Sequence, residues 1–313
     1  MRRGIWRHPL IVAARVLVVI VIYAVIIDRV NIGSVVARLT AATAAAFAIA
    51  VLLLLGQLGL CTARWRMLVA AGSAPPDFVS SYCINLEGSF FNQILPSTIG
   101  GDAWRVFRWR AGGVSVRAAA ASVLMDRFSG AMGAAILAML ASFLLWCDGV
   151  NGYYVLSIFL PSVAIVGGGI AFVFTIRNHH FVFSYFAGIR NLIAKLEGSL
   201  VLDRRFFISL LYSVASYVVC GLAVYATTLS LHLGISLLLT VAVTAAALLV
   251  TMIPVSVAGW GIRELSFMAL LAPFGVGAPD AFLVGVLFGL AGLVAALAGG
   301  VSLLADYGNG RRP

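Results

Sequence analysis

Long apolar segments dominate this chain and limit what it can fold into. A helix needs about 20 mostly apolar residues to cross about 30 Å of hydrocarbon, and segments that meet or approach this length lie at 10–27, 41–60, 118–146, 153–175, 206–230, 236–253 and 281–304. The chain is 62% hydrophobic and 10% charged, whereas soluble domains are about 45–50% apolar and about 25% charged. This excludes a soluble enzyme, a disordered protein and a disulfide scaffold. We predict one all-α polytopic membrane domain over residues 1–313, with about seven spanning helices.

Two shorter apolar segments do not fit the pattern of full-length spans. Residues 78–95 are apolar but contain Asn85, Glu87, Asn92 and Gln93 before Pro96, and residues 262–273 are too short to span. Irregular backbone at membrane depth is tolerated only where protein buries it or where it lines a wet cavity. We therefore predict two re-entrant or half-helix segments, at about 78–101 and 254–273.

The two interrupted segments share a sequence pattern. Residues 96–105 and 254–263 both fit P-x-x-x-[GA]-G-x-x-x-R, and the second copy starts 158 residues after the first. Paired segments interrupted by Gly and Pro indicate the midplane site of a transporter. The pattern suggests an inverted repeat.

The positive charge of the chain follows its predicted topology. There are 21 basic and 11 acidic residues, a formal net charge of +10. With residues 10–27 as a retained first helix, and 78–95 returning to the side it enters, 17 basic residues lie inside and two, Arg29 and Arg38, outside. This bias predicts a cytoplasmic (inner) membrane protein with both termini in the cytoplasm. The charge then favours anionic phospholipids at the cytoplasmic face, and we expect no nucleic acid partner.

The first interrupted segment, with its break at Pro96, and the residues just after it contain the densest group of polar residues. Glu87, Asn92, Asp102 and Arg105 are candidate ligands of a substrate. The hinge residues Pro96, Gly100 and Gly101 end one helix and permit a tight turn with exposed N–H groups, a plausible phosphate-binding concavity beside Arg105. Alternatively, these residues only cap and turn the loop and satisfy one another.

The second interrupted segment, with its break at residues 254–261, contains the candidate ligands Arg263 and Glu264. Pro254, Gly259 and Gly261 are its predicted hinge residues. Adjacent helical residues point about 100° apart, so we expect Arg263 and Glu264 to find separate partners. The alternative is an arginine that snorkels from a helix end.

Asp126 and Arg127 form a third charged group, inside an apolar segment. We expect an intramembrane ion-pair role, with Asp126 pairing with Arg105 or Arg263. Arg127 would pair with Glu87 or Glu264. A structural pair and a ligand contact are equally compatible with the sequence.

Signatures of catalysis or metal binding are not found. The four cysteines are scattered, His179 and His180 lack helical metal spacing, and Lys195 is the only lysine, outside any Walker A sequence. We expect no metal, no cofactor and no catalytic residues.

Three sequence segments resemble a known family. GSFFNQILPSTIGGDAWR, SVLMDRFSG and IPVSVAGWGIRE look like the flippase-like membrane domain of the lysylphosphatidylglycerol synthase family, which is similar to stand-alone proteins linked to hopanoid and archaeal glycan pathways. The resemblance implies a multi-helix fold that moves lipids between leaflets. The matching positions are Asn92, Pro96, Gly100, Gly101, Asp102, Arg105, Asp126, Arg127, Pro254, Gly259 and Glu264. The soluble aminoacyl transferase of two-domain members does not follow here, so we do not expect synthesis of an aminoacylated lipid.

These observations favour a lipid translocase or flippase-like protein. Arg105 and Arg263 would contact the head group of a polar-headed lipid that is anionic or linked to a lipid carrier. Glu87, Asp102 and Glu264 would hold a cationic group or a coupling proton. The alternatives are a membrane-embedded transferase that acts on a lipid carrier, and a non-transporting accessory subunit of a lipid or glycan pathway. A homo-oligomer or a pathway-enzyme partner is compatible with each.

Overall fold

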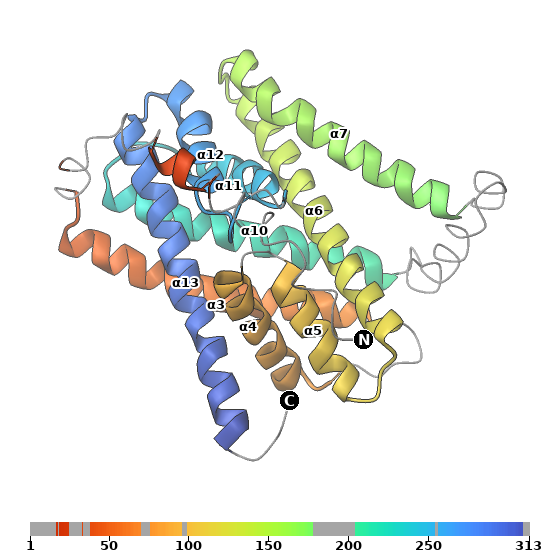
Figure 1. The fold of residues 1–313 in the computed structure, drawn as a ribbon. Coiled ribbons are helices and arrows are strands. Elements are labelled where there is room, and N and C mark those ends of the chain that lie inside the picture. Colours follow the sequence, from red (N-terminus) through yellow and green to blue (C-terminus); the bar gives the residue numbers. More distant parts are fainter. Residues whose placement is uncertain are drawn as a thin grey trace.

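The computed structural model describes residues 17, 19–24, 33, 38–69, 76–95, 99–177, 204–253 and 256–308. The regular secondary structure in this part of the chain is all helical and includes no strand, as the predicted all-α class requires (Figure 1). Five of its helices contain an apolar stretch long enough to cross a membrane. They are α3 (Ala41–Met67), α6 (Val116–Cys147), α7 (Gly152–Arg177), α10 (Arg204–Ser230) and α13 (Ala278–Gly308). The predicted first helix at 10–27 lies largely outside the described residues.

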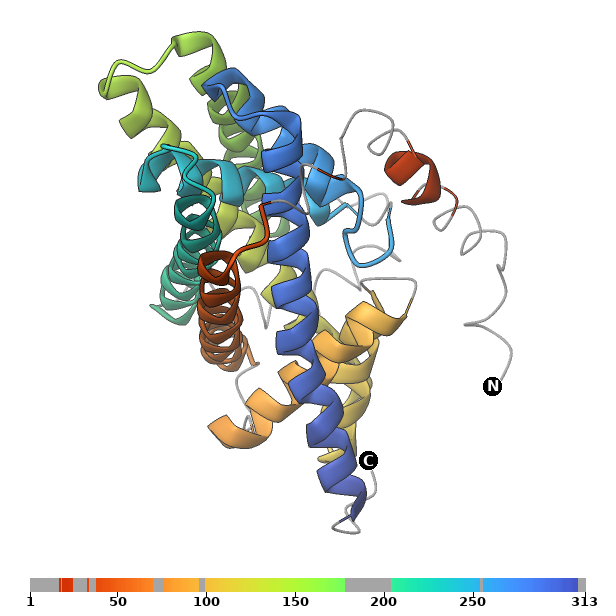
Figure 2. The ribbon, with the colours of Figure 1, turned by 90° about the vertical axis from the view of Figure 1, so that its left-hand side faces the viewer.

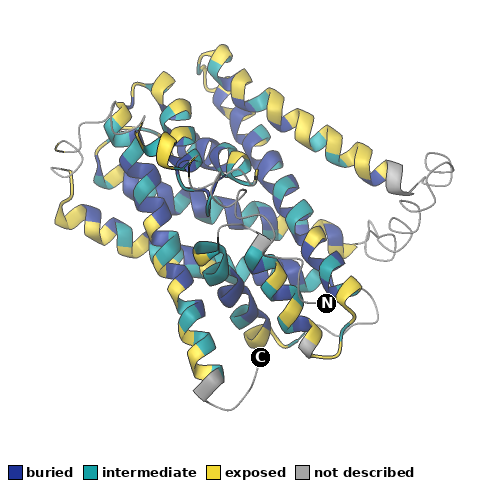
Figure 3. Ribbon diagram, in the orientation of Figure 1, coloured by how far each residue is buried: buried dark blue, intermediate teal, exposed yellow. Residues whose placement is uncertain are grey.

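Small side chains let the central helices pack closely. Ala134 and Ala138 of α6, Ala223 of α10 and Ala291 of α13 are almost fully buried in the main core. Without a hydrophobic force between helices in lipid, association depends on such close contacts. By contrast, α7 packs mainly on α6 and exposes most of its apolar surface (Figure 3), as expected of a helix that faces lipid.

The first predicted re-entrant segment is an antiparallel helix pair, α4 (Phe78–Ile94) and α5 (Ile99–Ala111). The carboxylate of Asp77 caps α4 by accepting from the Ser80 amide at 3.2 Å, and the hydrogen bonds with Ser80 lower the pKa of Asp77. Gly101 allows close approach, since a Cβ there would lie 2.0 Å from the Gly88 carbonyl oxygen. The chain therefore returns to the end of the bundle from which α4 started.

The structure corrects one predicted span, the segment 236–253 that precedes the second break. The 236–253 segment forms only a 15-residue helix, α11 (Leu237–Thr251), which is shorter than a membrane crossing requires. Ala258, Gly259 and Gly261 have positive φ angles of 51°, 79° and 83°, so the chain leaves helical geometry before α12 (Ile262–Leu271) and the 3₁₀ turn η1 (Ala272–Phe274). The pair α11–α12 is thus a second hairpin. Pro96 and Pro254 lie outside the described residues.

The two hairpins belong to opposite ends of the bundle. Val150, Leu231, Leu233, Ile235 and Val276 of three connections belong to the main core or pack against it, and Tyr154 contacts Phe274 at the end where η1 finishes. Trp65, Ile84, Trp109 and Ala119 pack together at the other end, beside the start of α4 and the end of α5. Helix α13 runs along both hairpins (Figure 2). An internal inverted repeat stays a prediction, but Gly101 of the first interrupted segment and Gly259 of the second are both buried.

Candidate functional site

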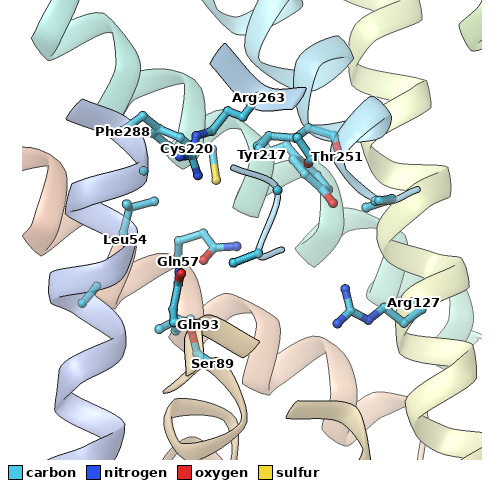
Figure 4. Close-up of a pocket in the computed structure, with 18 residues that line it drawn as sticks. Leu54, Gln57, Ser89, Gln93, Arg127, Tyr217, Cys220, Thr251, Arg263 and Phe288 are labelled. Carbon is cyan, nitrogen blue, oxygen red and sulfur yellow. The ribbon is translucent and has the colours of Figure 1, made fainter. Parts of the chain in front are cut away.

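Two adjoining cavities lie between the first hairpin, α4–α5, and the second, α11–α12. The larger, about 300 Å³, is lined by Ser89 and Gln93 of α4 and by Ala258, Gly259 and Arg263 from the second break (Figure 4). The smaller, about 200 Å³, is lined by Asn92, Asp102, Arg105 and Asp126. Gln57, Leu58, Ser89, Arg127, Tyr217 and Met252 line both. The structure therefore brings residues of both predicted constellations to two adjoining cavities that share part of their lining.

Asp126 is the centre of an ion-pair network that is buried at Arg64, Asp126 and Arg105 and partly exposed at Asp102 and Arg127. Its carboxylate accepts from Arg64 at 2.7 Å and from Arg105 at 2.9 Å. Asp102 accepts from Arg127 at 2.9 Å and lies 3.8 Å from Arg105. These contacts tie α3, α5 and α6 together. Such charges are stable inside a bundle only when they are paired and hydrogen-bonded.

Arg105 is held firmly yet keeps free donors. Its guanidinium carbon lies 4.6 Å from the ring centroid of Trp65, and its aliphatic stem passes Gly88, where a Cβ would lie 3.0 Å from Cγ. Only Nη1 is hydrogen-bonded; Nε and Nη2 are buried without a partner. Buried donors of this kind normally find an acceptor, and in this conformation both atoms are shielded from the cavity that the rest of Arg105 lines.

Arg263 is held in a similar way at the second break. It donates to Glu264 from Nε at 2.9 Å and from Nη2 at 2.6 Å, and it lies 4.4 Å from the ring centroid of Trp260. The expectation of separate partners for Arg263 and Glu264 was wrong, because two long side chains can converge although their Cα–Cβ directions differ. Arg105 and Arg263 thus share a design: each is paired with a carboxylate and stacked on a tryptophan.

Glu87 lies away from the cavities. Its carboxylate is fully buried and accepts from Trp104 at 2.8 Å, from Arg108 at 2.9 Å and from Ser302 at 3.3 Å. Arg108 also contacts Asp306 near the end of α13. Glu264 is similarly absent from the cavity lining. Glu87 therefore links α4, α5 and α13, whereas Glu264 accepts from Arg263 and from the Gly261 amide at the start of its own helix, α12.

The predicted pairings were partly right. Asp126 does pair with Arg105, but it also pairs with Arg64, and Arg127 pairs with Asp102 rather than with Glu87 or Glu264. Gly101 donates its amide to Asn92 at 2.9 Å, so this N–H is not free for phosphate as the turn hypothesis required. Gly100 and Gly101 lie in the first turn of α5, and Gly261 caps α12.

Sequence reasoning missed Arg64, Gln57 and Tyr217 as lining residues. Arg64 was counted only as a marker of orientation. Gln57, Cys61 and Arg64 nevertheless lie at i, i+4 and i+7, which places them on one face of α3. A polar stripe on an otherwise apolar helix was the available signal. Tyr217 had no such signal, since α10 carries other hydroxyl residues throughout.

Groups of three or more His, Cys, Asp or Glu that could hold a metal ion do not occur in the part of the chain that the structure describes. The acidic residues near the cavity contact arginines instead.

Helical composition, long apolar spans and a charged interior define a multi-pass integral membrane protein. The family model for the lysylphosphatidylglycerol synthase TM region matches residues 12–300. The chain therefore belongs to this family. No curated protein matches it at a significant level.

Proposed function

We propose that this protein moves a polar-headed lipid between the leaflets of a membrane. The observation that carries this proposal is the pair of adjoining cavities between the two hairpins, which are lined by Arg105, Arg127 and Arg263. An interior charge is costly in hydrocarbon and marks a substrate pathway more often than a structural need. The head group would occupy the cavity while the acyl chains stay in the bilayer.

In this proposal, the two tryptophan-stacked arginines bind the anionic part of the head group. Arg105 lies near the first break and Arg263 near the second, and Arg127 lines both cavities between them. Asp102 and Glu264 orient these guanidinium groups through the ion pairs described above. Guanidinium groups suit phosphate because their donors match its oxygens in a planar fork.

We further propose a cytoplasmic-membrane location with the start of α4 at the cytoplasmic face. Exposed arginines gather at that end of the described chain, at Arg110, Arg117, Arg204 and Arg205, and Arg38 is exposed at the other. Cytoplasmic loops carry such an excess, and the anionic inner leaflet would attract them.

The ion pairs also favour transport over a transferase reaction. An acid or base catalyst needs a carboxylate within reach of its substrate. Glu87, Asp102, Asp126 and Glu264 each contact at least one arginine, so their oxygens already have partners.

The test uses the purified full chain in proteoliposomes with head-group-labelled phosphatidylglycerol. We expect lipid movement that Arg105→Gln and Arg263→Gln each reduce by about tenfold or more, since one lost charged hydrogen bond is worth about 1.5–3 kcal/mol. Arg38→Gln is the matched control, because Arg38 forms an exposed pair with Asp280 at 3.4 Å.

Thermal unfolding in detergent separates lost transport from lost folding. Normal movement in folded Arg105→Gln and Arg263→Gln would refute the site. Covalent product from a labelled donor would favour the transferase, and movement only with an added partner would favour the accessory role.

A further inference from the structure

Ile22 and Tyr23, which precede the long helices in the chain, pack on the second hairpin and on α13. A Cβ built on Gly261 would lie 3.0 Å from Cγ2 of Ile22. The rings of Tyr23 and Phe282 meet edge to face, with their centroids 6.4 Å apart, and the Tyr23 side chain forms a hydrogen bond with that of Glu264. Tyr23 therefore reaches the ion pair at the start of α12 from a distant part of the sequence.

The Glu264 carboxylate is fully buried and is surrounded by hydrogen-bond donors. Arg263 contributes two, at 2.9 and 2.6 Å, and the Gly261 amide contributes one. The Tyr23 hydroxyl supplies a fourth hydrogen bond. A carboxylate has about four lone-pair sites, and a buried ion pair is stable only when such sites are satisfied. Tyr23 thus completes the set of donors around Glu264.

The ion pair is held against the bundle from two sides. Arg263, Glu264 and Gly261 belong to one short stretch of chain, so their mutual contacts do not fix this stretch in place. The Gly285 carbonyl of α13 accepts from Nε of Arg263 at 3.1 Å. That contact acts on the guanidinium, whereas the Tyr23 hydroxyl acts on the carboxylate. Two different parts of the chain therefore fix the two charged groups.

We propose that Tyr23 is a positioning residue for Arg263: by holding Glu264, it keeps the guanidinium at the wall of the larger cavity. Arg263 lines that cavity, whereas Tyr23 and Glu264 do not. Tyr23 acts only through Glu264, without touching a lipid. The proposal rests on the proposed function, because that function gives Arg263 its part in lipid movement.

Two tyrosines allow a matched comparison. Tyr23→Phe removes one hydroxyl and keeps the ring against Phe282. Tyr82→Phe also removes one hydroxyl, which donates to the Leu55 carbonyl at 2.9 Å, and Tyr82 lines neither cavity. Both variants lose one hydrogen bond, but only Tyr23 is bonded to a carboxylate that pairs with an arginine. A purely structural effect should therefore be similar in both.

The experiment measures how fast phenylglyoxal, which modifies arginine, reacts with Arg263 in the full chain in detergent, with each modified residue quantified by mass spectrometry. Tyr23→Phe should raise the rate at Arg263 by about tenfold and leave Arg105 unchanged, because a hydrogen bond to a charged group is lost. Tyr82→Phe should change neither rate. In proteoliposomes with head-group-labelled phosphatidylglycerol, Tyr23→Phe should slow lipid movement by about tenfold, and Tyr82→Phe should not slow it.

A second background tests the route through Glu264. In Glu264→Gln the side chain carries no charge to pair with Arg263, so Tyr23→Phe should have no further effect on Arg263 modification. Thermal unfolding identifies the variants that fold. Unchanged Arg263 modification in folded Tyr23→Phe would overturn the proposal, and so would an equal increase in Tyr82→Phe or an undiminished effect of Tyr23→Phe in Glu264→Gln. Faster Arg263 modification in Tyr23→Phe, with no lipid movement by the unaltered chain, would refute only the proposed function.

Discussion

At the scale of residues, the structure makes room for its interior arginines with glycines. A Cβ built on Gly289 would lie 1.8 Å from Nη2 of Arg263. No side chain tolerates such an approach, so the guanidinium would have to leave its present place between Glu264 and Trp260. The absence of a side chain at position 289 therefore positions Arg263 toward the cavity.

We predict that Gly289→Ala reduces lipid translocation by about tenfold while the protein still folds, with a stability loss of about 1–3 kcal/mol from overpacking. Gly56→Ala on α3 is the control, because a Cβ there meets nothing within 4 Å. Movement of labelled lipid and the melting temperature are measured together. Full activity of Gly289→Ala would show that Arg263 does not need this position.

The sequence identified the interior charges but not all of their partners. Asp102, Arg105, Asp126 and Arg127 stand out because charged residues are rare near apolar segments. Their pairing depends on how each helix is rotated about its axis and on long side chains that can reach several positions. This explains why the contact of Arg64 with Asp126 was missed and why Arg263 meets its own neighbour.

At the scale of elements, the α4–α5 hairpin depends on contact between two backbones. Gly88 and Gly101 face each other, and a Cβ on Gly101 would also lie 2.6 Å from the side chain of Asn92. The residue pattern predicted a turn near Gly100 and Gly101. It did not predict that α5 continues to Ala111, because Arg105, Arg108 and Arg110 make that segment too polar for a spanning helix.

Gly101→Ala should separate the two helices and destabilise the protein by about 1–3 kcal/mol. Gly167→Ala on α7 is the matched control, since a Cβ there meets nothing within 4 Å. We expect it to stabilise the protein slightly, because alanine is favoured over glycine in a helix by about 1 kcal/mol. Thermal unfolding in detergent checks this. A melting temperature of Gly101→Ala at or above that of Gly167→Ala would contradict the close packing.

At the scale of the whole molecule, two hairpins from opposite ends border two adjoining cavities. Apolar length correctly indicated the five long helices, but it overestimated α11, whose apolar segment continues into the break while its helix ends at Thr251. Length and hydropathy report where a chain can lie in lipid. They do not report whether it crosses or returns, which depends on contacts with α13 and α6.

A hairpin that crosses the membrane has its two ends at opposite faces, whereas a hairpin that returns has both ends at the same face. In a cysteine-free background, single cysteines replace Ser80 and Arg110 at the two ends of the first hairpin, and His232 and Ala272 beside the second; all four positions are exposed. A membrane-impermeant maleimide applied to intact cells should label the second pair and not the first, because each hairpin returns to its own side and the arginine-rich end faces the cytoplasm. In inverted vesicles the result should reverse. Labelling of Ser80→Cys and Arg110→Cys from different sides would mean that α4 crosses the membrane, and the two breaks could then not serve one head group from opposite leaflets.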